Sequence, residues 1–188
     1  MKKSVSCSLL QIKNDRAINF VKIWLFSTLI LSAFLTTPIY AVEVHSSNLS
    51  PSSDISPVLT LGVPGQEVSI SMAEIESLPM FETEEMVHFD GPEGRFSGVW
   101  LDDLLNKYGL NNESSLRFIA IDGYEVFIPK ESRQRKQYLI ATRLNALPIS
   151  SENLGPLLLI IPSDVGLASH LTESKNYWVW ALNEILVQ

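Results

Sequence analysis

From Val58 to the C-terminus the apolar residues come in short runs, and most runs are closed by proline, by glycine or by an Asp-Gly pair. Runs of this kind form short strands joined by tight turns rather than long helices. Two hairpins are predicted, one around Pro64-Gly65 and one around Asp122-Gly123, because these pairs suit tight turns. The stretches expected as strands or extended segments are Val58 to Val63, Val68 to Ile70, Met80 to Phe89, Leu116 to Ile121, Glu125 to Ile128, Tyr138 to Arg143 and Tyr177 to Val187.

Helical spacing occurs in two places. Ser71 precedes the run from Met72 to Leu78, and Glu74 stands at the third helical position, which is the arrangement of a capping box. Between Phe96 and Gly109 apolar side chains recur at helical spacing, which predicts the main amphipathic helix. The run from Leu157 to Ile161 is apolar at every position and predicts a central strand covered on both faces. Together these elements predict an α+β fold, a mixed β-sheet domain with a few short helices.

The first 41 residues have the order of a secretory signal peptide: a basic stretch, an apolar run from Ile23 to Leu35, and a small residue, Ala41, at the expected cleavage point. The apolar run has 13 residues, fewer than the roughly 20 that a membrane-spanning helix needs. We therefore expect cleavage after Ala41 and export to the periplasm, with no membrane span after cleavage; an uncleaved membrane anchor is the alternative. Cys7 is the only cysteine and is expected to leave with the signal peptide.

Residues 42–57 contain six serines and two prolines. They are expected to form a flexible leader, because they offer too little apolar surface to offset the entropy of ordering. Residues 58–188 then form the globular domain. The chain has 14 basic and 21 acidic residues, and residues 1–41 carry five and one of these, so 9 basic and 20 acidic residues remain, a net charge of −11. Such a charge repels polyanions, so nucleic acid is not an expected partner.

Four motifs follow one another in the second half of the chain: Phe96 to Leu105, Ala120 to Tyr124, Gly155 to Pro162, and Trp178 to Ile185. In this order and spacing they are similar to the motifs of the oxidoreductase molybdopterin-binding domain, the fold of the sulfite oxidase family. The resemblance runs from Leu59 to the C-terminus and is to small exported members that consist of little more than this domain. It implies a sulfite oxidase-like molybdopterin-binding fold for residues 58–188.

Enzymes of this family bind molybdenum through a cysteine about a dozen residues before the glycine that matches Gly98, and that count leads here to Met86. A thioether is a neutral, weak donor and cannot replace the anionic sulfur of such a centre. The family's enzymes also place basic residues after the strand that matches Leu157 to Ile161, where this chain has Asp164. The resemblance therefore implies the fold more strongly than catalysis, and no cofactor is predicted.

Two groups of polar residues are candidates for a ligand site. Asp122 and Tyr124 flank a tight turn and could present the Tyr124 hydroxyl to a ligand, or they could simply make the turn and pack on the sheet. Arg133 and Arg135, with Lys136, form a basic cluster whose guanidinium groups suit an anion. The alternative for this cluster is a solvated connection between two strands.

A third candidate is aromatic. Trp178 and Trp180 are two residues apart, so in a strand they would lie on the same face and could form one wall of a ligand site. Core packing is the alternative for both side chains.

Histidines and carboxylates raise two further hypotheses, a metal site and a hydrolase triad. A divalent-metal site would combine His88 with the neighbouring carboxylates and with His170, but no pair of histidines has metal-ligand spacing, so no metal is predicted. A hydrolase triad would combine Ser169, His170 and Asp164, but the glycines of a nucleophile elbow are missing. The carboxylates beside His88 are Glu84, Glu85 and Asp90.

These observations favour an exported, non-catalytic domain that binds a small ligand or a partner protein, as a signalling input for example. A molybdopterin-dependent oxidoreductase, or another redox-cofactor enzyme without a cysteine metal ligand, is the alternative. A scaffold for the assembly of another exported protein is a third hypothesis.

Overall fold

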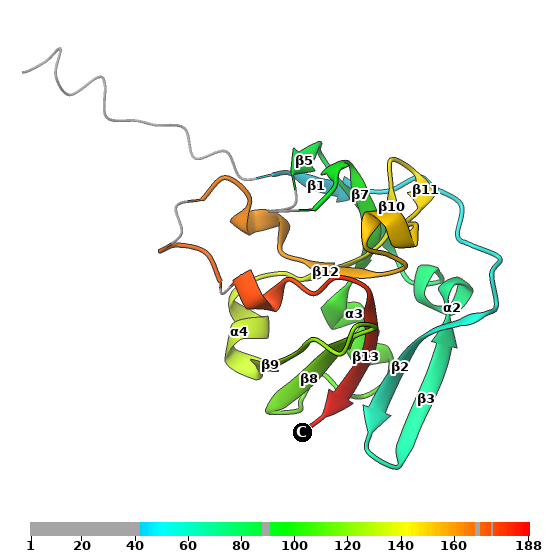
Figure 1. Cartoon of the computed structure of the whole chain (residues 1–188), viewed down its shortest axis with the longest axis vertical. Helices are drawn as coiled ribbons and strands as arrows, with labels where there is room; N and C mark the ends of the chain where they lie inside the picture. Colours follow the sequence, from blue (N-terminus) through cyan, green and yellow to red (C-terminus); the bar gives the residue numbers. More distant parts are fainter. Residues whose placement is uncertain (1–41, 88–90, 168–169, 174) are drawn as a thin grey trace, which may run out of the picture. The chain divides into compact units, whose positions relative to one another are not determined.

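Short strands dominate the regular structure of this chain. The computed structural model describes residues 42–87, 91–167, 170–173 and 175–188, which form a mixed α+β domain with its strands in open sheets (Figure 1). The larger sheet has the order β1-β4-β7-β10-β11, and β12 also pairs with β10. Its strands are β1 (Val44–Ser46), β4 (Met80–Thr83), β7 (Phe96–Trp100), β10 (Leu139–Leu144), β11 (Leu147–Pro148) and β12 (Leu158–Ile160).

The second sheet has the order β3-β2-β13-β8-β9, in which β13 runs parallel to β2 and antiparallel to β8. Both predicted hairpins are confirmed, β2 with β3 and β8 with β9. A separate pair consists of β5 and β6. These strands are β2 (Pro57–Val63), β3 (Gln66–Ser71), β5 (Met86–Val87), β6 (Glu93–Gly94), β8 (Ser115–Ala120), β9 (Glu125–Pro129) and β13 (Leu182–Val187).

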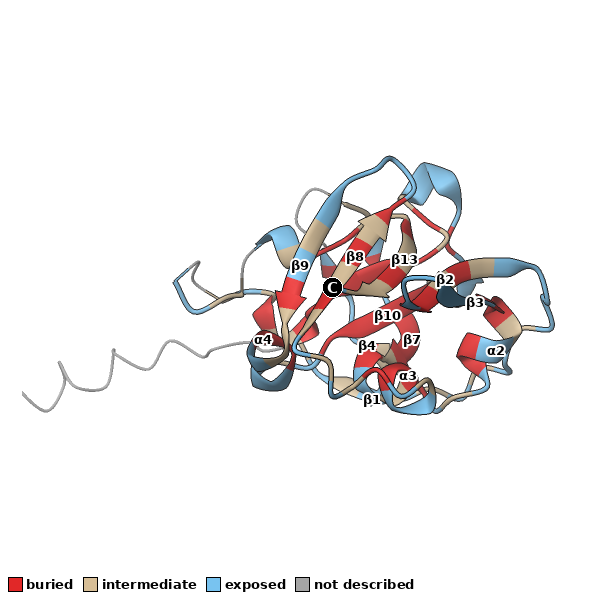
Figure 2. Cartoon of the chain, turned by 90° about the horizontal axis from the view of Figure 1, so that it is seen from below, coloured by how far each residue is buried: buried red, intermediate tan, exposed pale blue. Residues whose placement is uncertain are grey.

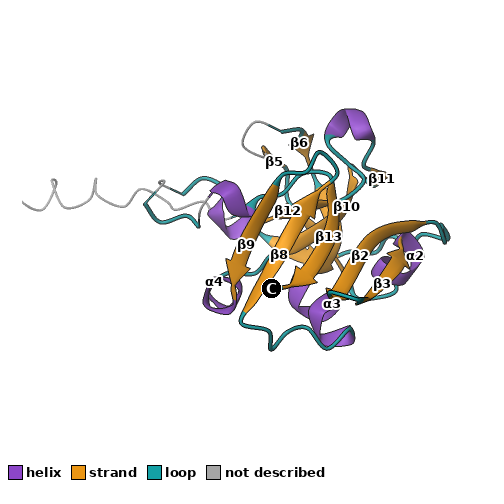
Figure 3. Ribbon diagram, turned by 60° about the horizontal axis from the view of Figure 1, so that its bottom comes forward, coloured by secondary structure: helices purple, strands orange, loops and turns teal. Residues whose placement is uncertain are grey.

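The core lies between the two larger sheets. Figure 3 shows the sheet of β9, β8, β13, β2 and β3 in front of β10 and β12 of the other sheet. A single cluster of buried side chains takes Phe118 and Ile185 from one sheet and Ile140 and Leu159 from the other. Figure 2 shows buried residues along β7, β10 and β13. All three residues of β12 are fully buried, as the apolar run from Leu157 to Ile161 predicted. The predicted central position is wrong, because among the strands of the described residues β12 pairs only with β10.

Short helices connect the strands. The predicted capping box is confirmed at α2, where the Ser71 hydroxyl accepts from the Glu74 amide at 3.2 Å and the Glu74 carboxylate accepts from the Ser71 amide at 2.8 Å. Among the described residues, no helix is both long and apolar enough to cross a membrane. The helices are α2 (Met72–Glu76), α3 (Leu101–Lys107), α4 (Lys130–Arg135) and the 3-10 turns η1 (Ser151–Asn153), η2 (Pro162–Asp164) and η3 (Lys175–Tyr177).

The predicted helix from Phe96 to Gly109 is wrong in its first part. Residues 96–100 form β7, which pairs with β4 on one side and with β10 on the other, and only the following residues form α3. Apolar spacing over so short a stretch fits a buried strand as well as a helix, and non-local pairing decides between them. Gly109 does take the left-handed conformation expected after the helix, with φ of 73°.

Residues 42–57 are also more ordered than a flexible leader. β1 pairs in register with β4, so that Val44 lies opposite Thr83, and the Ser47 amide donates to the Met80 carbonyl at 2.8 Å. Further along, the Ala73 amide donates to the Asp54 carbonyl at 2.9 Å. Backbone hydrogen bonds to the domain order this segment, although its own side chains bury little apolar surface.

Glu76, in α2, connects the same segment to the core. Its side chain is 1% exposed, and its carboxylate accepts hydrogen bonds from the Thr142 hydroxyl at 2.7 Å, from Arg143 Nε at 2.9 Å and from the Ser52 amide at 2.6 Å. Arg143 also donates to the Ser50 carbonyl at 2.9 Å. One buried ion pair therefore joins α2, β10 and residues 50–52.

This ion pair predicts an acid-sensitive contribution to stability. Burial alone would raise the pKa of Glu76, but hydrogen bonds from Arg143, Thr142 and Ser52 outweigh burial and hold the pKa below its ordinary value. A carboxyl whose folded-state pKa is depressed stabilises the fold above the unfolded-state pKa, and this stabilisation is lost as pH falls through the folded-state pKa. The stability difference between the wild type and Glu76→Gln is therefore expected to be constant near neutral pH and to shrink below about pH 4.3.

Urea unfolding of both proteins between about pH 7 and about pH 3 measures this difference. A difference that stays constant across this range would show that Glu76 does not titrate with folding.

Candidate functional site

A small cleft opens where β7 passes into α3, beside the start of β10. Its volume is about 200 Å³, and it is lined by Trp100, Asp102, Asp103, Gln137 and Tyr138. Pockets for drug-sized ligands are larger, about 300–1,000 Å³. The cleft therefore suits a small molecule or a single side chain of a partner.

Backbone pairing brings the two walls of the cleft together. Leu139 of β10 lies opposite Trp100 of β7, and the Leu101 amide donates to the Tyr138 carbonyl at 2.9 Å. The Trp100 ring packs on Phe81 of β4, with 5.3 Å between ring centroids. These contacts hold the aromatic wall at the end of the sheet, and the first turn of α3 adds the acidic wall.

The surroundings of the acidic wall shift the pKa of Asp102. Burial raises the pKa of Asp102, the nearby Asp103 adds to this increase, and Arg133 opposes it. Arg133 is 2% exposed and donates to the carbonyls of Ile128, at 2.8 Å, and Glu113, at 2.6 Å. A buried guanidinium close to Asp102 thus offsets part of the negative charge beside the cleft.

Tyr138 is the buried polar residue of this site. It is 2% exposed, and its hydroxyl makes no hydrogen bond to any residue that the structure describes. Burial raises the pKa of Tyr138, and the carboxylates of Glu173 and Asp164 add to the increase. The phenol therefore stays neutral and can donate or accept a hydrogen bond. With the Trp100 ring and two carboxylates, the lining favours a small ligand that has hydrogen-bond donors or a positive charge.

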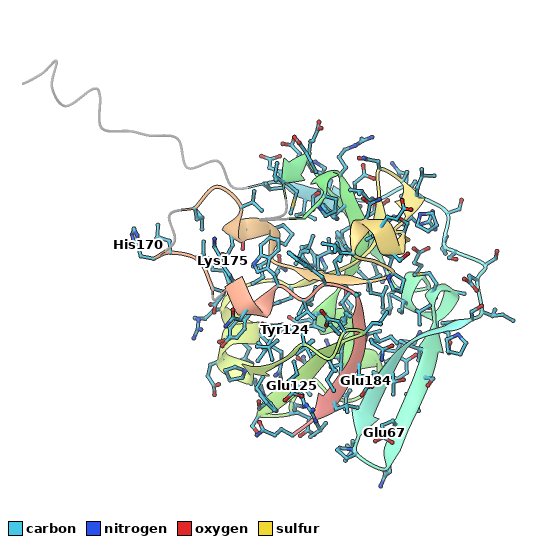
Figure 4. All side chains as sticks on the ribbon, viewed as in Figure 1. Glu67, Tyr124, Glu125, His170, Lys175 and Glu184 are labelled. Atoms are coloured by element: carbon cyan, nitrogen blue, oxygen red, sulfur yellow. The ribbon has the colours of Figure 1, made fainter. Side chains whose placement is uncertain are left out.

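The predicted turn residues Asp122 and Tyr124 lie at the tip of the β8–β9 hairpin. The Asp122 carboxylate accepts from the Tyr124 amide at 2.9 Å, so Asp122 stabilises the turn itself. The Tyr124 hydroxyl donates to the Asn176 carbonyl at 3.0 Å, and Figure 4 shows Tyr124 beside the segment that carries Lys175. In this structure both residues make structural contacts, and neither lines the cleft.

The basic cluster lies in and after α4, on the connection between β9 and β10 that was the alternative interpretation of these residues. Arg135 donates to the Glu173 carboxylate from Nε at 2.9 Å, and Lys136 Nζ donates to Asp164 Oδ1 at 2.6 Å. Arg133 is buried and donates to two backbone carbonyls. All three cations thus already have partners within the chain, which leaves little capacity for an external anion.

The two tryptophans precede β13 and do not share a regular strand. Trp178 is 5% exposed and belongs to the buried core, whereas Trp180 is half-buried against it. Between them Val179 forms an isolated bridge with Leu159 of β12, and Ala181 has a φ of 46°, which interrupts the extended backbone. Neither tryptophan lines the cleft.

The sequence alone did not identify the residues of the cleft as a site. The acidic pair Asp102-Asp103, close to an aromatic residue, is the one feature of the cleft that the sequence shows directly. It is not a specific signal of a site, because acidic residues are common in the first turn of any helix. Gln137 and Tyr138 join them through the pairing of β7 with β10, which a single sequence does not reveal.

Met86, the residue at the family's cysteine position, is in β5. It is 3% exposed, lies opposite Gly94 of β6 and belongs to the buried core. None of the described residues is a cysteine. A molybdenum centre would therefore meet a buried thioether at this position, and the residues present do not fit the metal.

A second hollow, of about 640 Å³, lies over β4. It is lined by His45, Glu82, Thr83, Glu84, Glu85 and Arg95. Of the residues proposed for a metal or a triad, His88, Asp90 and Ser169 lie outside the described residues. His170 is at the end of a loop away from β1 (Figures 1 and 4), and Asp164 already accepts from Lys136 and from the Glu173 amide.

Comparison with known proteins does not assign the chain. No protein-family model matches it, and no curated protein is significantly similar to it. The family resemblance therefore rests on the four sequence motifs.

Proposed function

We propose that this chain is an exported binding module that uses a sulfite oxidase-like molybdopterin-binding fold without molybdenum chemistry. The mixed α+β architecture is compatible with this fold. The positions of the four motifs support the proposal: the first forms β7 and α3, the second the β8–β9 turn, the third β12, and the fourth leads into β13. These elements pair or pack with one another in the core.

The observation that carries the proposal is Met86. A buried thioether at the family's cysteine position offers no anionic sulfur to a high-valent metal. The pterin phosphate would also need free cations, whereas Arg135 and Lys136 pair with Glu173 and Asp164. Since both features oppose the cofactor, binding rather than redox catalysis is the function that this arrangement supports.

The cleft beside Trp100 and Tyr138 is where we place the ligand. It combines a rigid aromatic wall with a buried phenol and two carboxylates, which is enough to bind and orient one small polar molecule. A protruding side chain of a partner protein is the other occupant that fits its volume.

One purification tests the proposal. The protein would be produced in a host that makes molybdopterin and is supplied with molybdate, alongside a cysteine-containing enzyme of the sulfite oxidase family as the positive control. We expect far less than one molybdenum atom and one pterin per chain, by elemental analysis and by pterin fluorescence. Native mass spectrometry of the same sample is expected to detect any retained small ligand or partner protein.

The variant Met86→Cys is the matched comparison. It restores a sulfur that can become a thiolate, but the paired cations remain, so we expect it to stay without molybdenum as well. Near-stoichiometric molybdenum and pterin in the wild type would overturn the proposal and favour an oxidoreductase with an unusual metal ligand.

A further inference from the structure

Three metal-binding side chains converge on one face of the β1–β4 pair. Glu43, His45 and Glu84 each offer one ligand atom, and these atoms all lie within 4.8 Å of one another. The distance from His45 Nε2 to Glu84 Oε1 is 4.0 Å. Ligand atoms around one zinc ion lie about 3.4 Å apart, given metal–ligand distances of about 2.0–2.2 Å. Small side-chain rotations would therefore complete the set.

The backbone holds these side chains in place. Val44 lies opposite Thr83 and His45 lies opposite Glu82. The Glu84 amide donates to the Glu43 carbonyl at 3.0 Å, which places Glu43 and Glu84 across from each other. Directly opposite residues, and residues two apart in one strand, share a face of the sheet. The ligand set thus stands at the end of a paired ladder, with His45 in β1 and with Glu43 and Glu84 one residue outside β1 and β4.

The charge arrangement independently favours a cation. Like charges directly opposite each other across two strands destabilise the pairing, and Glu43 and Glu84 are such a pair. Arg95, which lines the adjoining hollow, already pairs with Glu82 at 3.4 Å. A divalent ion between the two carboxylates would remove this repulsion.

We propose that Glu43, His45 and Glu84 bind a first-row divalent transition metal ion of the zinc type. An imidazole nitrogen with two carboxylate oxygens is a donor set that zinc accepts, whereas calcium and magnesium prefer oxygen ligands alone. Three protein ligands leave a fourth position for water, and His45 and Glu84 also line the hollow of about 640 Å³. The hypothesis of a metal site around His88 was set aside in the sequence analysis, and the site proposed here uses a different histidine. His45 reaches Glu84 because β1 pairs with β4.

Calorimetric titration of the untagged protein with Zn²⁺ tests the site. We expect one ion per chain, and we expect His45→Ala and Glu84→Gln each to weaken binding by at least about tenfold. Both side chains are more than half exposed, so these variants are expected to keep the wild-type fold, which circular dichroism verifies. Co²⁺ is a second probe, whose visible absorption is expected to change on binding in the wild type and not in His45→Ala.

Two matched controls distinguish Zn²⁺ binding at this site from Zn²⁺ binding by the other histidines. His170→Ala removes an exposed imidazole from a different segment, and His88→Ala removes the histidine closest in sequence to Glu84; both are expected to bind Zn²⁺ within twofold of the wild type. The proposal is overturned if the wild type binds no Zn²⁺, if His45→Ala binds it unchanged, or if either control loses it.

Discussion

Replacing Glu76 by alanine is expected to lower the free energy of unfolding by about 3–5 kcal/mol, because it removes one partner of a buried ion pair. Arg143 and Thr142 would lose the carboxylate to which they donate and keep only the Ser50 and Ser97 carbonyls as acceptors. The Ser52 amide would lose its hydrogen bond. Burying such groups without a partner costs more than the net value of the bonds themselves. We also expect residues 50–52 to become more mobile, since two of their contacts run through this pair.

Urea denaturation of Glu76→Ala measures the loss, and hydrogen exchange at residues 50–52 measures the mobility. Glu125→Ala is the matched control. Its carboxylate pairs with Arg117 on the surface, where both side chains are over 40% exposed, so we expect a change of less than about 1 kcal/mol. Equal losses in the two variants would show that the Glu76 network does not stabilise the fold.

Replacing Gly98 by alanine is expected to destabilise the protein by about 3 kcal/mol or more, because overpacking at this position meets backbone atoms. An added Cβ would lie 2.0 Å from the Ile140 carbonyl oxygen and 2.8 Å from the Ala141 Cα. Both atoms belong to β10, which pairs with Gly98 in the larger sheet. The neighbouring strand cannot turn away as a side chain would, so β7 and β10 would have to separate.

Gly109→Ala is the control for the alanine substitution itself. Gly109 has a φ of 73° and no heavy atom within 4 Å of an added Cβ. The substitution is therefore expected to lower the stability only by the strain of alanine in a left-handed backbone conformation, about 1–2 kcal/mol. Thermal and urea unfolding of both variants should therefore show that Gly98→Ala is much less stable than Gly109→Ala. The reverse order of stability would argue against close strand packing at Gly98.

Features that depend on neighbouring residues were predicted correctly from the sequence. The capping box at Ser71 and Glu74 needs residues only three positions apart, and the hairpin at Asp122-Gly123 needs a pair that tolerates a tight turn. The buried strand β12 was predictable because every residue from Leu157 to Ile161 is apolar. Interactions between residues close in sequence are enough to form these features, so tertiary contacts did not change them.

Features that depend on distant partners were missed or misassigned. Residues 96–100 have a spacing that fits a helix, and pairing with β4 and β10 makes them a strand. Residues 42–57 have the composition of a flexible segment, yet β4 orders them by backbone pairing and the Glu76 carboxylate by accepting from the Ser52 amide. Composition does not report either contact.

By itself, the sequence determined the α+β class, the two hairpins and the cap of α2, because short-range spacing and turn chemistry decide them. Only the tertiary structure decided where the chemistry lies. The cleft needs Trp100 beside Tyr138, and the proposed metal site needs His45 beside Glu84, pairs that are 38 and 39 residues apart in the chain. Strand pairing brings them together, and its register depends on how both sheets bury their apolar faces in one core.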